Sequence, residues 1–336
     1  MLLINGSYGE SGGQIVRTAV AFSVIFQKPI KVINIRSGRT KPGLKHQHLN
    51  AIKALAELTD AGVKGLELGS GSLEFSPKRL VKDEVKINIP TAGSIGLCLQ
   101  CLIPALMLVK KQVTINFSGG ATCGRGSPPL DYIQNVWFHN MNLWGLNPAS
   151  VIVEREGYYP KGGAAVIVKT NPSRIHSYTA LSRGKVLRIR GLSHCSKHLE
   201  KRMVADRQAR EPLRLLSADY DVKIKRLYSD SVCPGSSITL WAECENSVIG
   251  ADALGRLGVA SEQVAREAVK KLKNELDSNA SFDRHMADML IHVMALTGDS
   301  SITASEITNH AKTNIWLCEK FIDKKFILKN DLISID

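Results

Sequence analysis

The order in which apolar segments and glycine-rich loops recur is the feature that most limits how this chain can fold. A first unit contains, in order, a strand at Leu2–Asn5, a helix at Gln14–Ile25, a strand at Ile30–Ile35, a helix at Leu44–Leu58 and a hairpin at Leu66–Phe75. Helical spacing of apolar residues and β-branched runs distinguish the two kinds of element. The order is therefore strand-helix-strand-helix-hairpin, which predicts a compact α/β unit.

The same order recurs twice more along the chain. The second unit contains a strand at Val85–Ile89, a helix at Ile95–Val109, a strand at Val113–Phe117, a helix at Leu130–Leu143 and a hairpin at Val151–Val168. The third contains a helix at His285–Leu296, a strand at Ser301–Ile307, a helix that carries His310 and a hairpin at Phe326–Ile335. Its first strand is predicted at Val186–Arg190. Three such repeats predict an α/β (α+β) fold with one large domain.

A segment of mixed charge interrupts the third repeat. It contains a basic helix at Ser196–Leu216, two alternating segments at Asp221–Tyr228 and Ser237–Glu243 that we expect to pair as strands, and an amphipathic helix at Ser261–Leu276. These elements suffice for a small α/β domain. We therefore expect an inserted domain at 183–278 and a large domain formed by 1–182 and 279–336.

Positive charge is concentrated near the N-terminus. The net charge is +13, and no Asp or Glu occurs between Glu10 and Glu57. The same span holds Arg17, Lys28, Lys31, Arg36, Arg39, Lys41, Lys45 and Lys53, together with His46 and His48. A long stretch of one sign within apolar periodicity favours phosphate recognition, whereas a solvated basic face is the alternative interpretation.

The glycine-rich loop 6–13 resembles a dinucleotide-binding fingerprint only weakly. That motif requires an acidic residue about 20 positions later, where this chain is acid-free, and no GxxxxGK[ST] segment occurs. The backbone N–H groups of the loop can still cradle a phosphate. Glu10 within it is either a ligand for a divalent cation or an exposed loop carboxylate.

His310 adjoins an apolar stripe of helical spacing formed by Ile307, Ala311, Ile315, Cys318 and Ile322. Two starts of that helix are open. Thr303 and Glu306 form a capping box, whereas Thr308 as N-cap would place His310 in the first helical turn. In the second case the helix dipole would favour a neutral imidazole and an approaching phosphate. The alternative interpretation is a partly buried surface histidine.

The cysteines do not form a disulfide framework. They are seven and scattered, which predicts a reducing compartment, and the cytoplasm is the default because no signal peptide is evident. Cys98 and Cys101 lie in an apolar helix, where core packing is favoured over metal binding. His194, Cys195 and His198 are predicted to be surface residues. No apolar run approaches the roughly 20 residues that a membrane span requires.

Seven segments resemble the RNA 3′-terminal phosphate cyclase family, in the same order and over essentially the whole chain. They are GSYGESGGQIVRTA, IRSGRTKPGLKHQHL, TAGSIGLCLQCLIPAL, SPPLDYI, REGYYPKGGA, the HMADML helix and HAKTNI. The resemblance implies three α/β repeats with a small domain inserted in the third. It also implies an enzyme of the ligase class. That enzyme would convert an RNA 3′-phosphate to a 2′,3′-cyclic phosphodiester with ATP, through a histidyl-AMP and an RNA-adenylate, releasing pyrophosphate and AMP.

The resemblance also assigns roles to individual residues. It makes His310 the nucleophile and places Glu10 near the phosphates and a metal ion, Mg²⁺ or Mn²⁺. The remaining correspondences are the phosphate-binding residues Arg17, Arg36 and Arg39, the polar pair Gln47 and His48, Gln100 near the nucleotide, Pro128 and His285 flanking adenine, and Asp288 close by. Some members carry tyrosine at the position of His285, and the loop Thr122–Gly126 departs from the bacterial pattern.

The implied partners are ATP and RNA 3′-phosphate ends. The oligomeric state stays open, with a homodimer among the options. Three rival functions are a non-catalytic ribosome-assembly paralogue, an adenylyltransferase for another terminal phosphate, and a transferase for small phosphorylated metabolites. His310, Glu10 and Arg17 argue against the first, since the paralogues lack the nucleophilic histidine.

Overall fold

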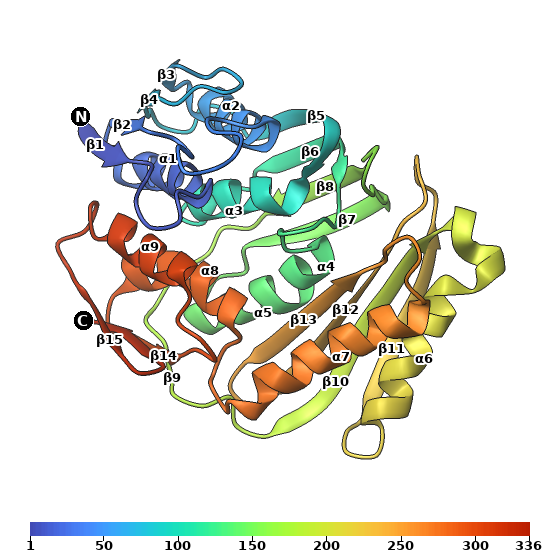
Figure 1. Ribbon diagram of the computed structural model, residues 1–336. Coiled ribbons are helices and arrows are strands. Elements are labelled where there is room, and N and C mark those ends of the chain that lie inside the picture. Colours follow the sequence, from blue (N-terminus) through green and yellow to red (C-terminus); the bar gives the residue numbers. More distant parts are fainter.

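The computed structural model describes residues 1–336, and three of its sheets share one strand order (Figure 1). The first sheet contains β1 (Leu2–Asn5), β2 (Ile30–Ile33), β4 (Leu73–Ser76) and β3 (Gly62–Lys64). The second contains β5 (Glu84–Ser94), β6 (Thr114–Ala121), β8 (Ala165–Thr170) and β7 (Ala149–Arg155). The third contains β9 (Thr179–Ala180), β14 (Ser300–Thr303), β16 (Leu332–Ile335) and β15 (Phe326–Lys329).

The strand directions are also shared among these sheets. In each one the first two strands are parallel and the hairpin strands are antiparallel. Parallel neighbours need a crossover connection, which α1 (Gln14–Phe26) supplies between β1 and β2, and α3 (Ile95–Leu106) between β5 and β6. The α/β class predicted from the sequence is confirmed.

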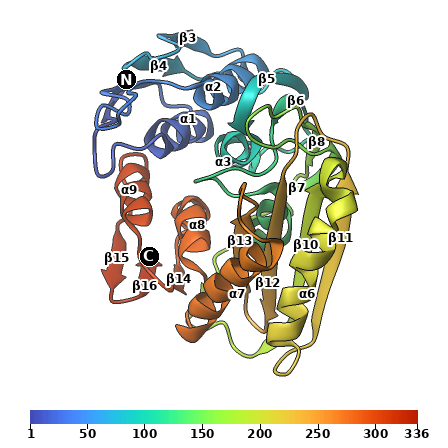
Figure 2. The same cartoon turned by 45° about the vertical axis from the view of Figure 1, so that its right-hand side comes forward.

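Helices from different units pack on one another between these sheets. They are α1, α2 (His46–Thr59), α3, α8 (Arg284–Thr297), α9 (Asn309–Cys318) and the helical run 130–144, which contains α4 (Leu130–Tyr132) and α5 (Phe138–Met141). Figure 2 shows α1, α3 and α8 toward the middle of the large body, and α9 at its left-hand side above β15 and β16. One apolar core joins all three units. No helix is both long and apolar enough to cross a membrane.

The fourth sheet belongs to the segment that interrupts the third unit. It has the order β11 (Val222–Ser229), β10 (Val186–Ser196), β12 (Ser236–Cys244) and β13 (Val248–Leu254). Helices α6 (Val204–Leu216) and α7 (Ser261–Asp277) pack on it and share a second apolar cluster with it. The chain leaves and re-enters the large body at one place, where Ser182 Oγ donates a hydrogen bond to Asn279 Oδ1 at 3.3 Å.

Three predictions within this segment are wrong. Val186–Arg190 begins β10 of the fourth sheet, and the first strand of the third unit is the two-residue β9. The sequence signal for β10 is stronger because β10 has 11 residues and β9 has only 2. The strands β11 and β12 are not neighbours, since β10 lies between them. Helix α6 begins only at Val204, after a 3₁₀ turn at Lys197–Arg202.

His194 on β10 joins the fourth sheet to the second unit and is buried, as is Cys195, against our expectation that both are surface residues; His198 is exposed. His194 Nε2 lies 3.2 Å from Asp131 Oδ2, and His194 Nδ1 lies 2.8 Å from the Tyr158 hydroxyl. Burial opposes the charge on His194, but Glu156 and Asp131 together outweigh it and raise its pKa to about 9. The surface that His194 contacts supplies the carboxylates that permit this burial.

Candidate active site

Helix α9 begins at the second of the two starts that the sequence allows. Thr308 is the N-cap, and its Oγ1 accepts a hydrogen bond from Ala311 N at 3.0 Å. The same hydroxyl donates to Asp288 Oδ1 at 2.5 Å, which ties the start of α9 to α8. His310 therefore lies in the first turn, where the dipole of α9 disfavours a positive charge on its ring.

The loop after β1 runs along α9 and contacts it at three points. The ring of Tyr8 stacks on Trp316, with centroids 3.9 Å apart and planes inclined by 7°. Gly9 faces Thr313, and a Cβ at Gly9 would lie 2.5 Å from Thr313 Oγ1. Glu10 Oε2 lies 3.1 Å from His310 Nε2. Since these partners recur every three residues of α9, the loop and the helix share one register.

The ring of His310 is held neutral although a carboxylate faces it. Burial lowers its pKa most, Glu10 raises it, and Arg17, Arg39 and His285 lower it further, so that the net shift is downward. Half of the side chain is still exposed. The Gln14 amide donates to the His310 carbonyl at 3.2 Å and holds the backbone in place. A neutral, accessible imidazole is a competent nucleophile near neutral pH.

Arg17 is the buried cation of the site. It lies on α1, its Nη2 donates to Gln100 Oε1 at 3.2 Å, and its Nε has no hydrogen-bond partner. Burial lowers its pKa to about 10, which still leaves it charged at neutral pH. Gln14 Oε1 is likewise buried without a partner. Unpaired buried polar atoms are costly, and a bound anion or polar ligand would satisfy them.

Two glycines separate Arg17 from the exposed Arg39 and allow His48 to approach. A Cβ at Gly13 would lie 2.2 Å from His48 Nε2 and 3.3 Å from Arg17 Nη1. A Cβ at Gly12 would lie 3.7 Å from Arg39 Nη2, which in turn lies 3.8 Å from Glu10 Oε2. These contacts place the start of α1 among basic side chains, which suits an anion.

His48 is buried and neutral. Burial, reinforced by Arg17, lowers its pKa to about 3. Its Nδ1 accepts a hydrogen bond from Lys45 N at 3.1 Å, so the ring proton is on Nε2, the nitrogen that lies against Gly13. His48 therefore presents a neutral donor to the loop, rather than a second cation beside Arg17.

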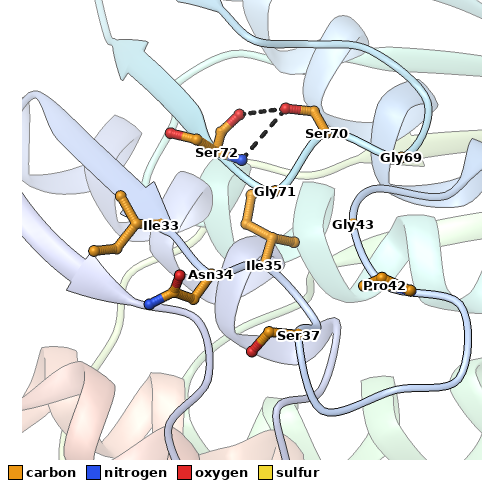
Figure 3. A pocket seen from close by; sticks show the side chains of 10 residues that line it. All are labelled: Ile33, Asn34, Ile35, Ser37, Pro42, Gly43, Gly69, Ser70, Gly71 and Ser72. Atoms are coloured by element: carbon orange, nitrogen blue, oxygen red, sulfur yellow. Dashed lines mark hydrogen bonds between the residues drawn. The ribbon is translucent and has the colours of Figure 1, made fainter.

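The Arg36 side chain stabilises its own loop through hydrogen bonds to the backbone. Its Nη1 donates to the carbonyls of Lys41 at 2.8 Å and Gly43 at 2.9 Å, and its charge lowers the pKa values of Arg17 and His48. The adjoining residues line an open pocket of about 560 Å³, shown in Figure 3 with Ser70 hydrogen-bonded to Ser72. None of the predicted site residues lines this pocket, so we do not assign it to the site.

The remaining predicted residues lie around α3 and α8. Asp288 is largely buried, and burial raises its pKa to about 7. His285 is exposed at the start of α8 and is one of the residues that lower the pKa of His310. Gln47 and Pro128 both contact α3. The Gln47 carbonyl accepts a hydrogen bond from Cys98 Sγ at 3.4 Å, and the Pro128 carbonyl lies against Gly96. Cys98 and Cys101 are free and buried, as predicted.

Four contact residues were not singled out from the sequence: Tyr8, Gln14, Thr313 and Trp316. Gln14 follows the double glycine directly and begins α1, a position that signals a role at the loop. The others have no signal of their own, because each is defined by a partner some 300 residues away. No group of three or more His, Cys, Asp or Glu side chains is arranged to hold a metal ion.

The amino-acid sequence of this chain matches a family of known proteins. The family model described as "RNA 3'-terminal phosphate cyclase" matches residues 8–328. A protein of that name from Pyrococcus abyssi is 42% identical over 334 residues, covering 99% of this chain and 96% of the relative. Another from Ignicoccus hospitalis is 40% identical, covering 96% and 93%. A third from Thermococcus onnurineus is 41% identical, covering 99% and 96%.

Proposed function

The chain belongs to the RNA 3′-terminal phosphate cyclase family, and we propose that His310 carries the reaction as a covalent histidyl-AMP. In this proposal ATP drives the conversion of an RNA 3′-phosphate to a 2′,3′-cyclic phosphodiester. The observation that carries it is the neutral ring of His310 in the first turn of α9, 3.1 Å from Glu10 and beside Arg17 and Arg39.

The proposed chemistry has three displacements at phosphorus. A ring nitrogen of His310 attacks the α-phosphorus of ATP, a P–N bond forms, and the P–O bond to pyrophosphate breaks. An oxygen of the RNA 3′-phosphate then attacks the same phosphorus and releases His310. The neighbouring 2′-hydroxyl finally attacks the RNA phosphorus, loses its proton and expels AMP. The ribose holds this hydroxyl beside its target, so its effective concentration is very high.

Protein groups position the phosphates and neutralise their charge, which is the main task in phosphoryl transfer. Arg17 has an unpaired Nε, Arg39 is exposed beside Glu10, and the start of α1 offers backbone N–H groups. Glu10 would hold a divalent ion, Mg²⁺ or Mn²⁺, through its carboxylate. When bound, such an ion supplies further charge neutralisation.

Matched RNA and DNA oligomers with a 3′-phosphate test the proposed reaction. The RNA should release AMP and end as a cyclic phosphodiester. The DNA lacks the 2′-hydroxyl and should stop at the adenylylated end. Binding of both should weaken as salt rises, because phosphates that contact basic groups release counterions. An RNA 3′-phosphate that is neither adenylylated nor cyclised, while another terminal phosphate consumes ATP, would favour a different adenylyltransferase.

We also propose that the protein acts in the cytoplasm, which is a reducing compartment. All seven cysteines are free and buried, and none forms a disulfide. Structural thiols of this kind persist in a reducing compartment.

A further inference from the structure

An aromatic side chain with one open face lies beside the proposed nucleophile. Tyr8 is 43% exposed although its ring stacks on Trp316. The ammonium group of Lys320 lies 5.3 Å from the centroid of Trp316. No second ring stacks on Tyr8. The Tyr8 ring therefore stacks on Trp316 through one face, no aromatic ring covers its other face, and the exposure of the residue gives a flat group access to it.

The position of Tyr8 relative to His310 follows from the shared register of loop and helix. Glu10 contacts His310, Gly9 faces Thr313, and Tyr8 stacks on Trp316. Six residues of α-helix separate His310 from Trp316, a rise of about 9 Å. The aromatic ring thus lies within the reach of one or two nucleotides from a phosphate at His310.

The charge around this ring favours a polyanion. Lys312 is exposed on α9, Lys320 is exposed in the turn that follows α9, and Arg39 is exposed beside Glu10. Single-stranded nucleic acids bind where basic side chains contact the backbone and an aromatic ring stacks on a base. Tyr8 supplies the aromatic ring, and these cations can supply the backbone contacts.

We propose that the open face of Tyr8 stacks on the base of one of the last two nucleotides of the RNA 3′ end. This inference rests on the proposed function, because it presupposes an RNA 3′-phosphate at His310. Every base has an aromatic face, so the contact would orient the end without selecting a sequence. The competing role for Tyr8 is structural: the ring would only fasten the glycine-rich loop to α9.

Abasic substrates distinguish the two roles. We would compare RNA 3′-phosphate oligomers that carry an abasic residue at the last or the penultimate position with the intact oligomer, and measure KM and kcat for AMP release. The variants are Tyr8→Leu, which can pack on Trp316 but offers no aromatic face, and Tyr8→Phe as the matched control. In the wild type and in Tyr8→Phe, one abasic position should raise KM about fivefold or more.

In Tyr8→Leu the intact oligomer should already show that rise, and the abasic residue should add nothing to it. Self-adenylylation with ATP alone is measured for all three proteins as the reference, so that a displaced Glu10 is separated from a lost contact with RNA. Absence of an adenylate in the wild type would instead refute the proposed function. A normal adenylate, with Tyr8→Leu impairing intact and abasic oligomers by the same factor, or with no effect of either abasic position, would overturn the stacking proposal.

Discussion

At the scale of single residues, the charge state of His310 is a balance of opposing contributions. Burial lowers its pKa most, Arg17, Arg39 and His285 lower it further, and Glu10 raises it. The net shift is downward, so the ring is neutral above its ordinary pKa of about 6.5 and for some distance below it. Loss of nucleophilicity on acidification should therefore set in only below that ordinary value.

Removing the carboxylate of Glu10 should lower the pH at which self-adenylylation is lost. In Glu10→Gln the contribution that raises the His310 pKa is lost, while burial and the cations remain. The midpoint at which self-adenylylation fails should move to lower pH, even if the maximal rate falls because a metal ligand is lost. Single-turnover self-adenylylation measured from pH 4.5 to 8 tests this, with Glu67→Gln as a control on an exposed loop. A midpoint that stays in place or rises would contradict the assignment.

The sequence singled out His310 and offered Thr308 as one of two possible starts of its helix, but it did not predict the surroundings of the ring. Thr308 is an N-cap residue followed by apolar spacing, a local pattern that competes in the sequence with the capping box of Thr303 and Glu306. The contact with Glu10 is not local, since the two residues lie 300 positions apart in the chain. Only the family resemblance placed them in one site. The burial of Arg17 was also missed, because an arginine within an apolar helix normally keeps its charged end in water.

At the scale of elements, the glycine-rich loop and α9 depend on each other through Gly9. Its φ of +56° favours glycine, and a Cβ would lie 2.5 Å from Thr313 Oγ1. The lack of a side chain therefore lets the loop lie flat against the helix and keeps Glu10 opposite His310.

Gly9→Ala should break this contact. We expect it to lower the free energy of unfolding by about 1–2 kcal/mol, the cost of a left-handed conformation for an L-residue, and to slow self-adenylylation. Gly9→Ala/Thr313→Ala removes the collision but not the backbone strain, so it should recover part of the rate. Urea unfolding and adenylylation rates measure both effects. Gly71→Ala is the matched control, because a Cβ at Gly71 would meet no atom within 4 Å. Equal rates in Gly9→Ala and the control would refute the coupling.

The errors at this scale have a common origin. Strands with clustered β-branched residues, such as β2 and β6, were located close to their observed positions. The assignment of strands to sheets failed for β9 and β10. The two residues of β9 carry almost no sequence signal, so the start of the longer β10 was predicted as the first strand of the third unit. Pairing of β11 with β12 failed for a related reason, since β10 enters between them from earlier in the chain.

At the scale of the whole molecule, the segment predicted at 183–278 is both separately packed and firmly attached. It has its own apolar cluster, and its ends meet where Ser182 bonds Asn279. It also contacts the second unit, since Val248 pairs with the Asn140 amide and Gly250 packs against Tyr132 and Val136. Whether it is a separable domain remains a prediction.

Excision of that segment should leave a folded catalytic body. We would join Ser182 to Asn279 through a short Gly-Ser bridge, with the full chain carrying the same bridge after Ser182 as the control. None of the proposed nucleotide-binding residues lies within 183–278, so some self-adenylylation should persist. The melting temperature should fall, because Tyr132 and Val136 lose their cover, and Val136→Ser is included to limit aggregation. A soluble, folded body without any self-adenylylation would contradict the prediction.

The central claim is that His310 is the residue that becomes adenylylated. ATP labelled at the α-phosphate should leave an acid-labile, base-stable label on the wild-type protein, and peptide mass spectrometry should locate it on His310. His310→Asn should carry no label at an unchanged melting temperature, while His46→Asn, a change at an exposed histidine of the basic stretch, should be labelled normally. Label that persists in His310→Asn, or that maps to another residue in the wild type, would contradict the account.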